Sequence, residues 1–144
     1  MALDIMMRFV YLTSLLLLSA CATTSTGGTS RVEAASGLSV PELAEGECGL
    51  FAWTTDQKRS FVFYADEDSA KFVPDGEIVQ LTSAKAFPAL DYQDSAGNPV
   101  SLKLGQGEPL VGGVRYPSAR IVSKTEDGWD RIMPVSIVRA CQSG

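Results

Sequence analysis

Histidine is absent from this 144-residue sequence, and its absence removes several kinds of catalytic chemistry. Ser–His and Cys–His nucleophile activation both need an imidazole, and histidine is also the commonest zinc ligand. Cysteine is scarce as well, with three residues in the whole chain. We therefore predict no catalytic residues, no metal site and no cofactor, and we expect the protein not to be an enzyme.

Basic residues are outnumbered by acidic ones, 12 to 17, and the net charge is -5. Proteins that bind nucleic acid draw on clustered Lys and Arg side chains to neutralise phosphates. A basic face is also what attracts a protein to anionic lipid head groups. The charge balance therefore predicts neither a nucleic-acid partner nor a membrane contact through a basic surface.

Long apolar runs are also missing. The apolar run from Phe9 to Leu18 is too short to cross a hydrocarbon core of ~30 Å, which takes about 20 residues. No later segment is longer, so we expect no transmembrane helix. The run ends in Leu18-Ser19-Ala20-Cys21, in which small residues, suited to a peptidase that grips the backbone closely, precede a thiol.

These four residues resemble the lipobox of bacterial lipoprotein precursors. The resemblance implies that residues 1–20 are a signal peptide, that Cys21 is lipidated, and that the chain is cut before it. Two or more acyl chains anchor a protein stably in a membrane. Ala22, with no Asp at that position, resembles the outer-membrane sorting pattern. We therefore expect a lipid-anchored protein of the cell envelope, held in the outer membrane and facing the periplasm.

Residues 21–40, which begin with the lipidated cysteine, are rich in Thr, Ser, Gly and Ala, and their apolar residues do not recur with the period of a strand (2) or a helix (3.6). Such a segment cannot bury enough apolar surface to order itself, so we interpret it as a flexible linker. Residues 41–144 are then the folded domain. Ser39 followed by Pro41 and Glu42 has capping-box spacing, which predicts a single helical turn over Pro41–Glu45.

Cys48 and Cys141 remain as a pair once the lipid occupies Cys21. In an oxidising compartment this parity favours a disulfide between them. The alternative is two buried free thiols, because cysteine also packs well as a small hydrophobic residue.

From Cys48 onward the signals are those of strands and turns, and they predict about eight short strands. The alternation of apolar and polar residues is clearest from Val100 to Leu104, and turn residues recur every eight to twelve positions. We expect breaks at Pro117 and Pro134, and a loop or bulged connection over 105–113, which is rich in glycine. The fold class predicted is all-β, a small antiparallel barrel or sandwich closed by the disulfide.

The strand from Ser60 to Ala65 is expected to place Phe61 and Phe63 on one face and Val62 and Tyr64 on the other. These aromatics, with Trp53, Trp129 and Tyr92, could line a ligand groove, but aromatics of a small domain are more often core.

Two acidic clusters are candidate sites. The run from Asp66 to Asp68 could form a weak calcium site, yet it lacks the ligand spacing of a known loop and is interpreted as a hairpin turn. Glu126 and Asp127 could be a carboxylate pair for acid–base chemistry, but they precede Gly128 as ordinary turn residues.

A further resemblance lies near the end of the chain, in Gly112-Gly113-Val114-Arg115-Tyr116, in Ser123-Lys124 and in Arg139-Ala140-Cys141-Gln142. These segments look like the membrane-bound inhibitors of c-type lysozyme, which are lipoproteins with a small β-barrel. The resemblance implies that Arg115, Tyr116 and Lys124 bind a partner. The whole chain also looks like small uncharacterised lipoproteins of the Gram-negative envelope.

Two functions follow as hypotheses. The first is a lipid-anchored periplasmic protein whose non-enzymatic β-domain binds or supports a protein partner in the envelope. The alternative is an inhibitor of c-type lysozyme that plugs the cleft of the enzyme.

Overall fold

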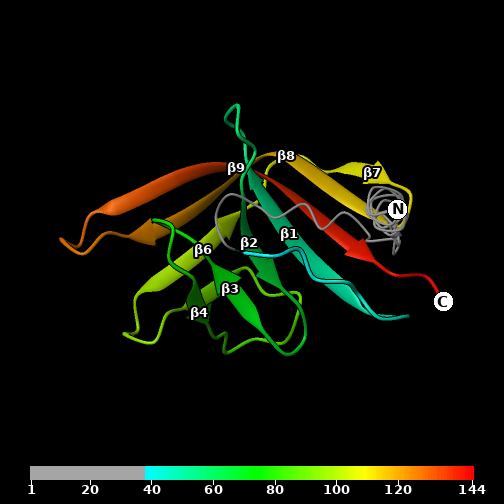
Figure 1. The fold of residues 1–144 in the computed structure, drawn as a ribbon, viewed down its shortest axis with the longest axis horizontal. Coiled ribbons are helices and arrows are strands. Elements are labelled where there is room, and N and C mark those ends of the chain that lie inside the picture. Colours follow the sequence, from blue (N-terminus) through cyan, green and yellow to red (C-terminus); the bar gives the residue numbers. More distant parts are fainter. Residues whose placement is uncertain (1–37) are drawn as a thin grey trace, which may run out of the picture. The chain divides into compact units, whose positions relative to one another are not determined.

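Antiparallel strands dominate residues 38–144, which are the part of the chain described by the computed structural model (Figure 1). The predicted signal peptide, Cys21 and most of the predicted linker lie outside these residues. Within the described part the strands are β1 (Cys48–Thr54), β2 (Phe61–Ala65), β3 (Ala70–Phe72), β4 (Val79–Leu81), β5 (Asp91–Gln93), β6 (Pro99–Lys103), β7 (Glu108–Leu110), β8 (Gly113–Lys124) and β9 (Asp130–Cys141).

Eight of these strands follow one another around a nearly closed barrel in the order β4-β3-β2-β1-β9-β8-β6-β5, and β7 pairs with β8 outside this path. The two ends of the path meet at a single bridge between Thr82 and Gln93, whose backbone N–H groups each donate to the carbonyl of the other, at 2.9 and 2.8 Å. The prediction of a small antiparallel all-β barrel is confirmed. Among the described residues, no helix is long and apolar enough to span a membrane.

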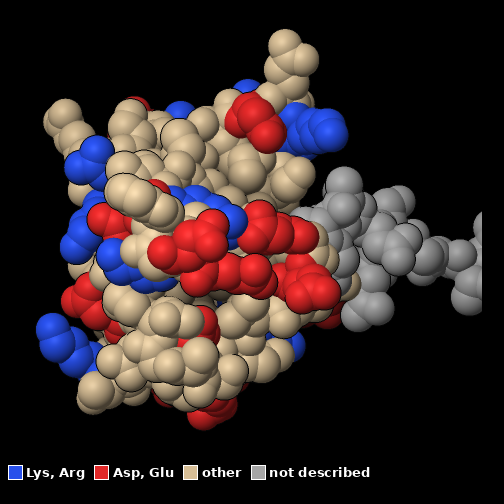
Figure 2. All heavy atoms as spheres, turned by 90° about the vertical axis from the view of Figure 1, so that its left-hand side faces the viewer, with Lys and Arg blue, Asp and Glu red and all other residues tan. Residues whose placement is uncertain are grey.

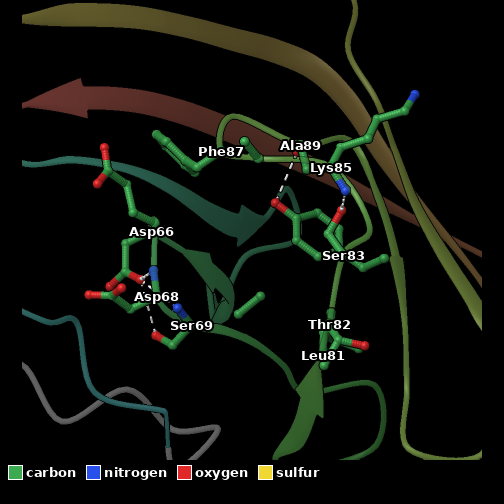
Figure 3. Close-up of a pocket in the computed structure, with 13 residues that line it drawn as sticks. Asp66, Asp68, Ser69, Leu81, Thr82, Ser83, Lys85, Phe87 and Ala89 are labelled. Carbon is green, nitrogen blue, oxygen red and sulfur yellow. Dashed lines mark hydrogen bonds between the residues drawn. The ribbon is translucent and has the colours of Figure 1, made fainter.

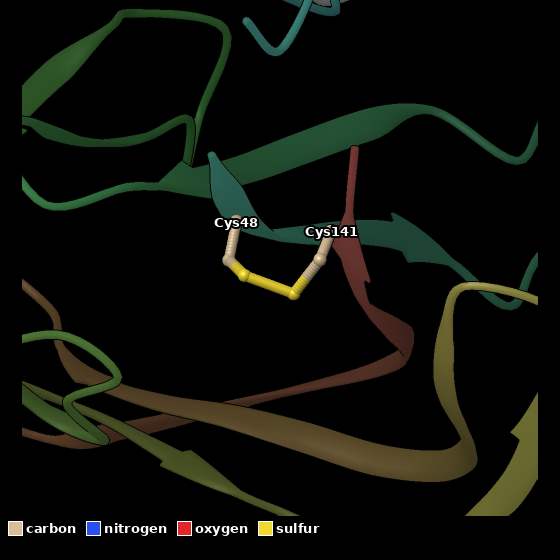
Figure 4. Close-up of a disulfide and its surroundings, with 2 residues drawn as sticks. All are labelled: Cys48 and Cys141. Atoms are coloured by element: carbon tan, nitrogen blue, oxygen red, sulfur yellow. A yellow bond between two sulfur atoms is a disulfide. The ribbon is translucent and has the colours of Figure 1, made fainter. Parts of the chain in front are cut away.

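The first and last strands are joined covalently. β1 and β9 pair along seven residues of each strand, from Cys48 opposite Cys141 to Thr54 opposite Val135. The two cysteines form a disulfide, with their Cα atoms 4.0 Å apart (Figure 4). The predicted disulfide is confirmed, and the alternative of two free thiols is excluded.

The barrel interior is filled by its own side chains, and every strand of the barrel contributes at least one. Phe63, Ile121, Val135 and Ile137 have no accessible surface there. The full interior cluster is Leu50, Ala52, Val62, Phe63, Ala65, Ala70, Phe72, Leu81, Ala89, Tyr92, Val100, Leu102, Ala119, Ile121, Val135 and Ile137. Burying one large apolar side chain contributes about 1.5–3 kcal/mol, so this cluster is the main source of stability.

A second, smaller cluster covers the outer face of β1 and β2. It consists of Leu38, Phe51, Phe61, Tyr64 and Val73, with Leu43, Trp53 and Ala140 packed against it. Leu38 is 4% exposed. Of the predicted linker only residues 38–40 are described, and Leu38 among them packs onto the barrel.

The expected faces of β2 are wrong. Phe63 lies with Val62 in the interior cluster, whereas Phe61 lies with Tyr64 in the outer one. The cause is a register shift, because Ala52 pairs with Phe63 while the next residue, Trp53, pairs with Phe61. A β-bulge of this kind inserts one extra residue and reverses the alternation beyond it.

The expected breaks at Pro117 and Pro134 are also wrong, because each proline lies within a 12-residue strand. Pro117 falls in the irregular part of β8, between the residues that pair with β7 and those that pair with β6. Pro134 lies one residue beyond the β1–β9 ladder, so β9 is paired there only with β8. A strand tolerates proline where the missing N–H is not needed by a neighbour.

The region 105–113 contains a strand that composition did not predict. Glu108–Leu110 forms β7 and pairs with the start of β8, and the connecting Gly112 has a φ of +78°, which glycine adopts without strain. A Cβ at Gly113 would lie 2.0 Å from the carbonyl oxygen of Arg139. The glycines that suggested a loop thus allow a tight hairpin against β9.

The predicted helical turn over Pro41–Glu45 does not form. The chain instead makes a tight turn, in which the Glu47 N–H donates to the Ala44 carbonyl at 3.0 Å. Its backbone is also bonded to the C-terminal segment, since the Gly46 N–H donates to the Gln142 carbonyl at 2.9 Å. Tertiary pairing has overridden a local capping signal.

Candidate functional site

An open groove of about 520 Å³ crosses the outer surface of β1, β9 and β8. We call it the Trp53 groove. It is lined by Trp53, Thr54, Thr55, Arg59, Arg115, Pro117 and Ser136. These residues are far apart in the sequence, and the antiparallel pairing of β1 with β9 and of β9 with β8 brings them together.

The groove lies where the ladder between β8 and β9 is interrupted. Between the pairs Tyr116–Ile137 and Ala119–Val135, β8 has two unpaired residues, Pro117 and Ser118, whereas β9 has one, Ser136. A strand with extra residues bends away from its partner. Ser136 pairs with Trp53 of β1 but with no residue of β8, and it therefore borders an open surface instead of a continuous sheet.

Trp53 is the aromatic residue of the groove, and its ring packs against Phe51 and Phe61 of the outer cluster. Its ring centroid lies 5.2 Å from that of Phe61 and 6.2 Å from that of Phe51, and it is stacked on Phe51 at an interplanar angle of 16°. Its half-buried side chain belongs to the edge of the outer cluster. A fixed indole loses little freedom when a ligand packs on it.

Arg59 is presented by the loop between β1 and β2. Asp56 fixes this loop, because its Oδ1 accepts hydrogen bonds from the Thr54 hydroxyl at 2.8 Å, the Arg59 N–H at 3.0 Å and the Lys58 N–H at 3.1 Å. The bond from Thr54 is the main reason that the pKa of Asp56 is lowered. Arg59 has a φ of +47°, in the left-handed region that a residue with a Cβ rarely adopts.

Arg115 enters the groove from β8. Its guanidinium Nη2 lies 3.5 Å from Oε2 of Glu108, its cross-strand neighbour on β7, and both side chains are about half exposed. An exposed ion pair of this kind contributes at most about 1 kcal/mol, so it restrains Arg115 without neutralising it fully.

The other predicted partner-binding residues lie elsewhere. Tyr116 follows Arg115 in β8 and packs against the interior cluster. Lys124 ends β8, roughly 30 Å from Arg115 at ~3.3 Å per residue, and its Nζ lies 2.7 Å from Oδ1 of Asp130. The structure thus places Arg115 in a groove and does not bring Lys124 or Tyr116 to it.

A second hollow, of about 230 Å³, adjoins the bridge between the ends of the barrel path (Figure 3). The acidic turn (Asp66 to Asp68) and Ser69 line one side of it, Ser83 and Lys85 line the other, and Phe87 lies above in the view of Figure 3. Tyr92 reaches into it from β5, donates its hydroxyl to the Ala89 carbonyl at 2.9 Å, and has a pKa raised to about 12 by burial. That hydroxyl is therefore a neutral structural donor.

Asp66 shows what the acidic turn does. Its carboxylate accepts hydrogen bonds from the Tyr64 hydroxyl and from the N–H groups of Asp68 and Ser69, the latter two at 2.8 and 2.7 Å. Burial by itself raises the pKa of Asp66, but these bonds outweigh it and lower the pKa. The turn joins β2 to β3, so its interpretation as a hairpin turn is confirmed.

Charged side chains elsewhere on the surface are mixed in sign. Figure 2 shows a face on which Asp and Glu side chains gather in a band, with Lys and Arg beside it. Glu126 and Asp127 are exposed in the turn between β8 and β9, as expected of turn residues. In residues 38–144 no three His, Cys, Asp or Glu side chains are grouped so that they could hold a metal ion.

The aromatic residues are divided between core and surface. Phe61, Phe63, Tyr64 and Tyr92 are buried, as expected of core residues, whereas Trp129 is 76% exposed beside the turn between β8 and β9. Trp53 alone among these six lines the groove.

The Trp53 groove therefore offers two guanidinium groups, a fixed indole, a proline ring and hydroxyls. These groups bind ligands through ion pairs, hydrogen bonds and stacking. Sequence reasoning singled out Arg115 and considered Trp53, but Arg59 carried no signal, because its role depends on the shape of its loop. Comparison with known proteins assigns the chain to no family: no family model, no curated protein and no solved structure matches it.

Proposed function

We propose that this chain is a lipid-anchored protein of the cell envelope whose β-barrel is a non-enzymatic binding domain for a protein partner. The lipobox-like residues 18–21 support the anchor on Cys21, and Ala22 supports the outer membrane as its site. The disulfide between Cys48 and Cys141 supports an oxidising compartment such as the periplasm.

The observation that carries the binding role is the Trp53 groove. Trp and Arg are the residues in which the binding energy of protein interfaces is most often concentrated, and here Trp53, Arg59 and Arg115 line one open surface. The barrel behind it is filled with its own side chains, so the groove rests on a rigid support.

The test is crosslinking in intact cells. A photo-crosslinking amino acid at Thr55, which is exposed in the groove, is expected to capture a defined envelope protein. The matched control is Gln80, an exposed polar residue on β4 that does not line the groove. Capture from neither position, or equally from both, would contradict the proposal. Capture of a c-type lysozyme that the purified protein also inhibits would favour the alternative function.

The anchor is tested separately. Cys21→Ser is expected to abolish labelling by a fatty-acid analogue and to remove the mature protein from the membrane fraction. Cys48→Ser provides the control, because it removes a cysteine of the folded domain and is expected to retain the label. Persistent labelling of Cys21→Ser would refute the lipid anchor.

A further inference from the structure

We infer that the Trp53 groove binds an acidic peptide segment of the partner, with a carboxylate held between Arg59 and Arg115 and an adjacent apolar side chain against Trp53. This inference rests on the proposed function and deepens it, since it names the chemistry that the partner must present.

The charge of the groove is the first argument. Two guanidinium groups line it and no carboxylate does. Within the described residues no ion pair or side-chain hydrogen bond engages the guanidinium of Arg59, and Arg115 has only the 3.5 Å contact with Glu108. Asp56, the acidic residue nearest to Arg59 in the sequence, directs one carboxylate oxygen to Thr54 and to the loop N–H groups.

A carboxylate is the group that this arrangement suits. Guanidinium groups bind carboxylates through planar, paired hydrogen bonds, so two of them lining one groove favour a negatively charged ligand there. The loop is built to hold Arg59 despite its left-handed backbone, and backbone strain that the surroundings enforce is typical of ligand sites.

The apolar part of the groove argues for a peptide over a small anion. Trp53 and Pro117 present ring surfaces beside the arginines, and these would remain unused by an isolated phosphate. Strand addition is not the expected mode of binding here, because β1 lies between β2 and β9, and the interruption of the β8–β9 ladder leaves only Ser136 of β9 unpaired with β8. We therefore expect recognition to go through side chains.

Trp53 itself can report binding. The chain contains two tryptophans, so Trp129→Phe leaves Trp53 as the single indole, and Trp129 lies 76% exposed outside the groove. The full-length chain carrying this change, in detergent micelles, is titrated with an acetylated and amidated peptide of alternating Glu and Leu. The controls are the same peptide with Gln for Glu, inorganic phosphate, and vesicles of anionic phospholipid.

The Glu peptide is expected to bind at least tenfold more tightly than the Gln peptide, and its affinity should fall as salt is raised. Arg59→Gln and Arg115→Gln should each weaken binding by about tenfold, which is the loss of one charge-assisted contact. Arg120→Gln is the matched control, because Arg120 is an exposed arginine of β8 outside the groove, and it should leave affinity unchanged.

Equal affinity for the two peptides, or equal effects of the three arginine variants, would overturn the inference. Saturation of the Trp53 signal by phosphate alone, or by vesicles, at the concentration where the Glu peptide acts would identify an anion or lipid site instead. If crosslinking from Thr55 still captures a protein in any of these cases, the acidic peptide is refuted and the proposed function stands.

Discussion

Removing the disulfide should lower the stability of the barrel by a large and calculable amount. Cys48 and Cys141 are 93 residues apart in the sequence, so the bond closes almost the whole domain into a loop in the unfolded state. On the chain-entropy model a loop of this size loses about 16 cal/mol/K, which is about 4.7 kcal/mol at 25 °C. Small domains are stable by only about 5–15 kcal/mol, so the loss is a large share of the total.

The variant is the double substitution Cys48→Ser with Cys141→Ser, which leaves no reactive thiol in the barrel. Neither side chain is fully buried, so little packing is lost with the sulfur atoms. Urea unfolding followed by tryptophan fluorescence gives the free energy of unfolding for both proteins, and reduction of the unaltered protein provides an independent comparison. A decrease in the free energy of unfolding of less than about 1 kcal/mol would refute the reasoning. It would mean that the seven paired residues of β1 and β9 stabilise the contact between these strands without the disulfide.

Three further substitutions test the core, the glycines and the acidic turn. Ile137→Ala in the barrel interior should lower the free energy of unfolding by about 2–5 kcal/mol in urea. Val138→Ala is the control, because Val138 is only half-buried and its loss should be smaller. Equal losses would contradict the assigned faces of β9. Gly113→Ala should lower the free energy of unfolding by about 1–3 kcal/mol, and by more than Gly107→Ala does. The reason is that the new Cβ meets a backbone carbonyl at position 113 and only side chains at position 107. A lower melting temperature for Gly107→Ala than for Gly113→Ala would contradict this. Because the pKa of Asp66 is lowered on folding, its carboxylate stabilises the fold above its unfolded pKa of about 3.9, and this is lost as pH falls through the lower folded pKa. Asp66→Asn should therefore be less stable at neutral pH and lose less on acidification, and an unchanged acid dependence of urea unfolding would count against this role.

The barrel could be predicted from the sequence because its signals are local. The alternation of apolar and polar residues from Val100 to Leu104 and the turn at Glu126–Gly128 each depend on neighbouring residues, and each is present in the structure. The disulfide followed from the parity of the cysteines. These features repeat around the chain, so errors at individual strand ends did not alter the fold class.

The expectations that were wrong concern positions where one strand meets another. The bulge at β2 depends on its register with β1, and the continuity of β9 through Pro134 depends on where β1 ends. Such facts are set by pairing between segments distant in the sequence, which no local pattern contains.

The Trp53 groove could be predicted from local sequence patterns even less than the strand register could. Trp53, Arg59, Arg115 and Ser136 come from three strands and a loop, and only the order of strands in the sheet makes them neighbours. The sequence could mark Arg115 through a resemblance, but the left-handed backbone of Arg59 is visible only in the folded loop.

The closure of the barrel is unequal around its circumference. Between β1 and β9 a covalent bond and seven facing pairs hold the strands. The segment after β4 is held to β5 by the two reciprocal hydrogen bonds of one bridge and by the bond from the Ser83 hydroxyl to the Asp91 carbonyl. The bridge joins fewer facing residues than any ladder of the barrel, so native-state hydrogen exchange should begin there. The amide protons of Thr82 and Gln93 would then exchange well before those of Phe51 or Val138. Local opening of the barrel would thus begin at the strand pair farthest from the disulfide.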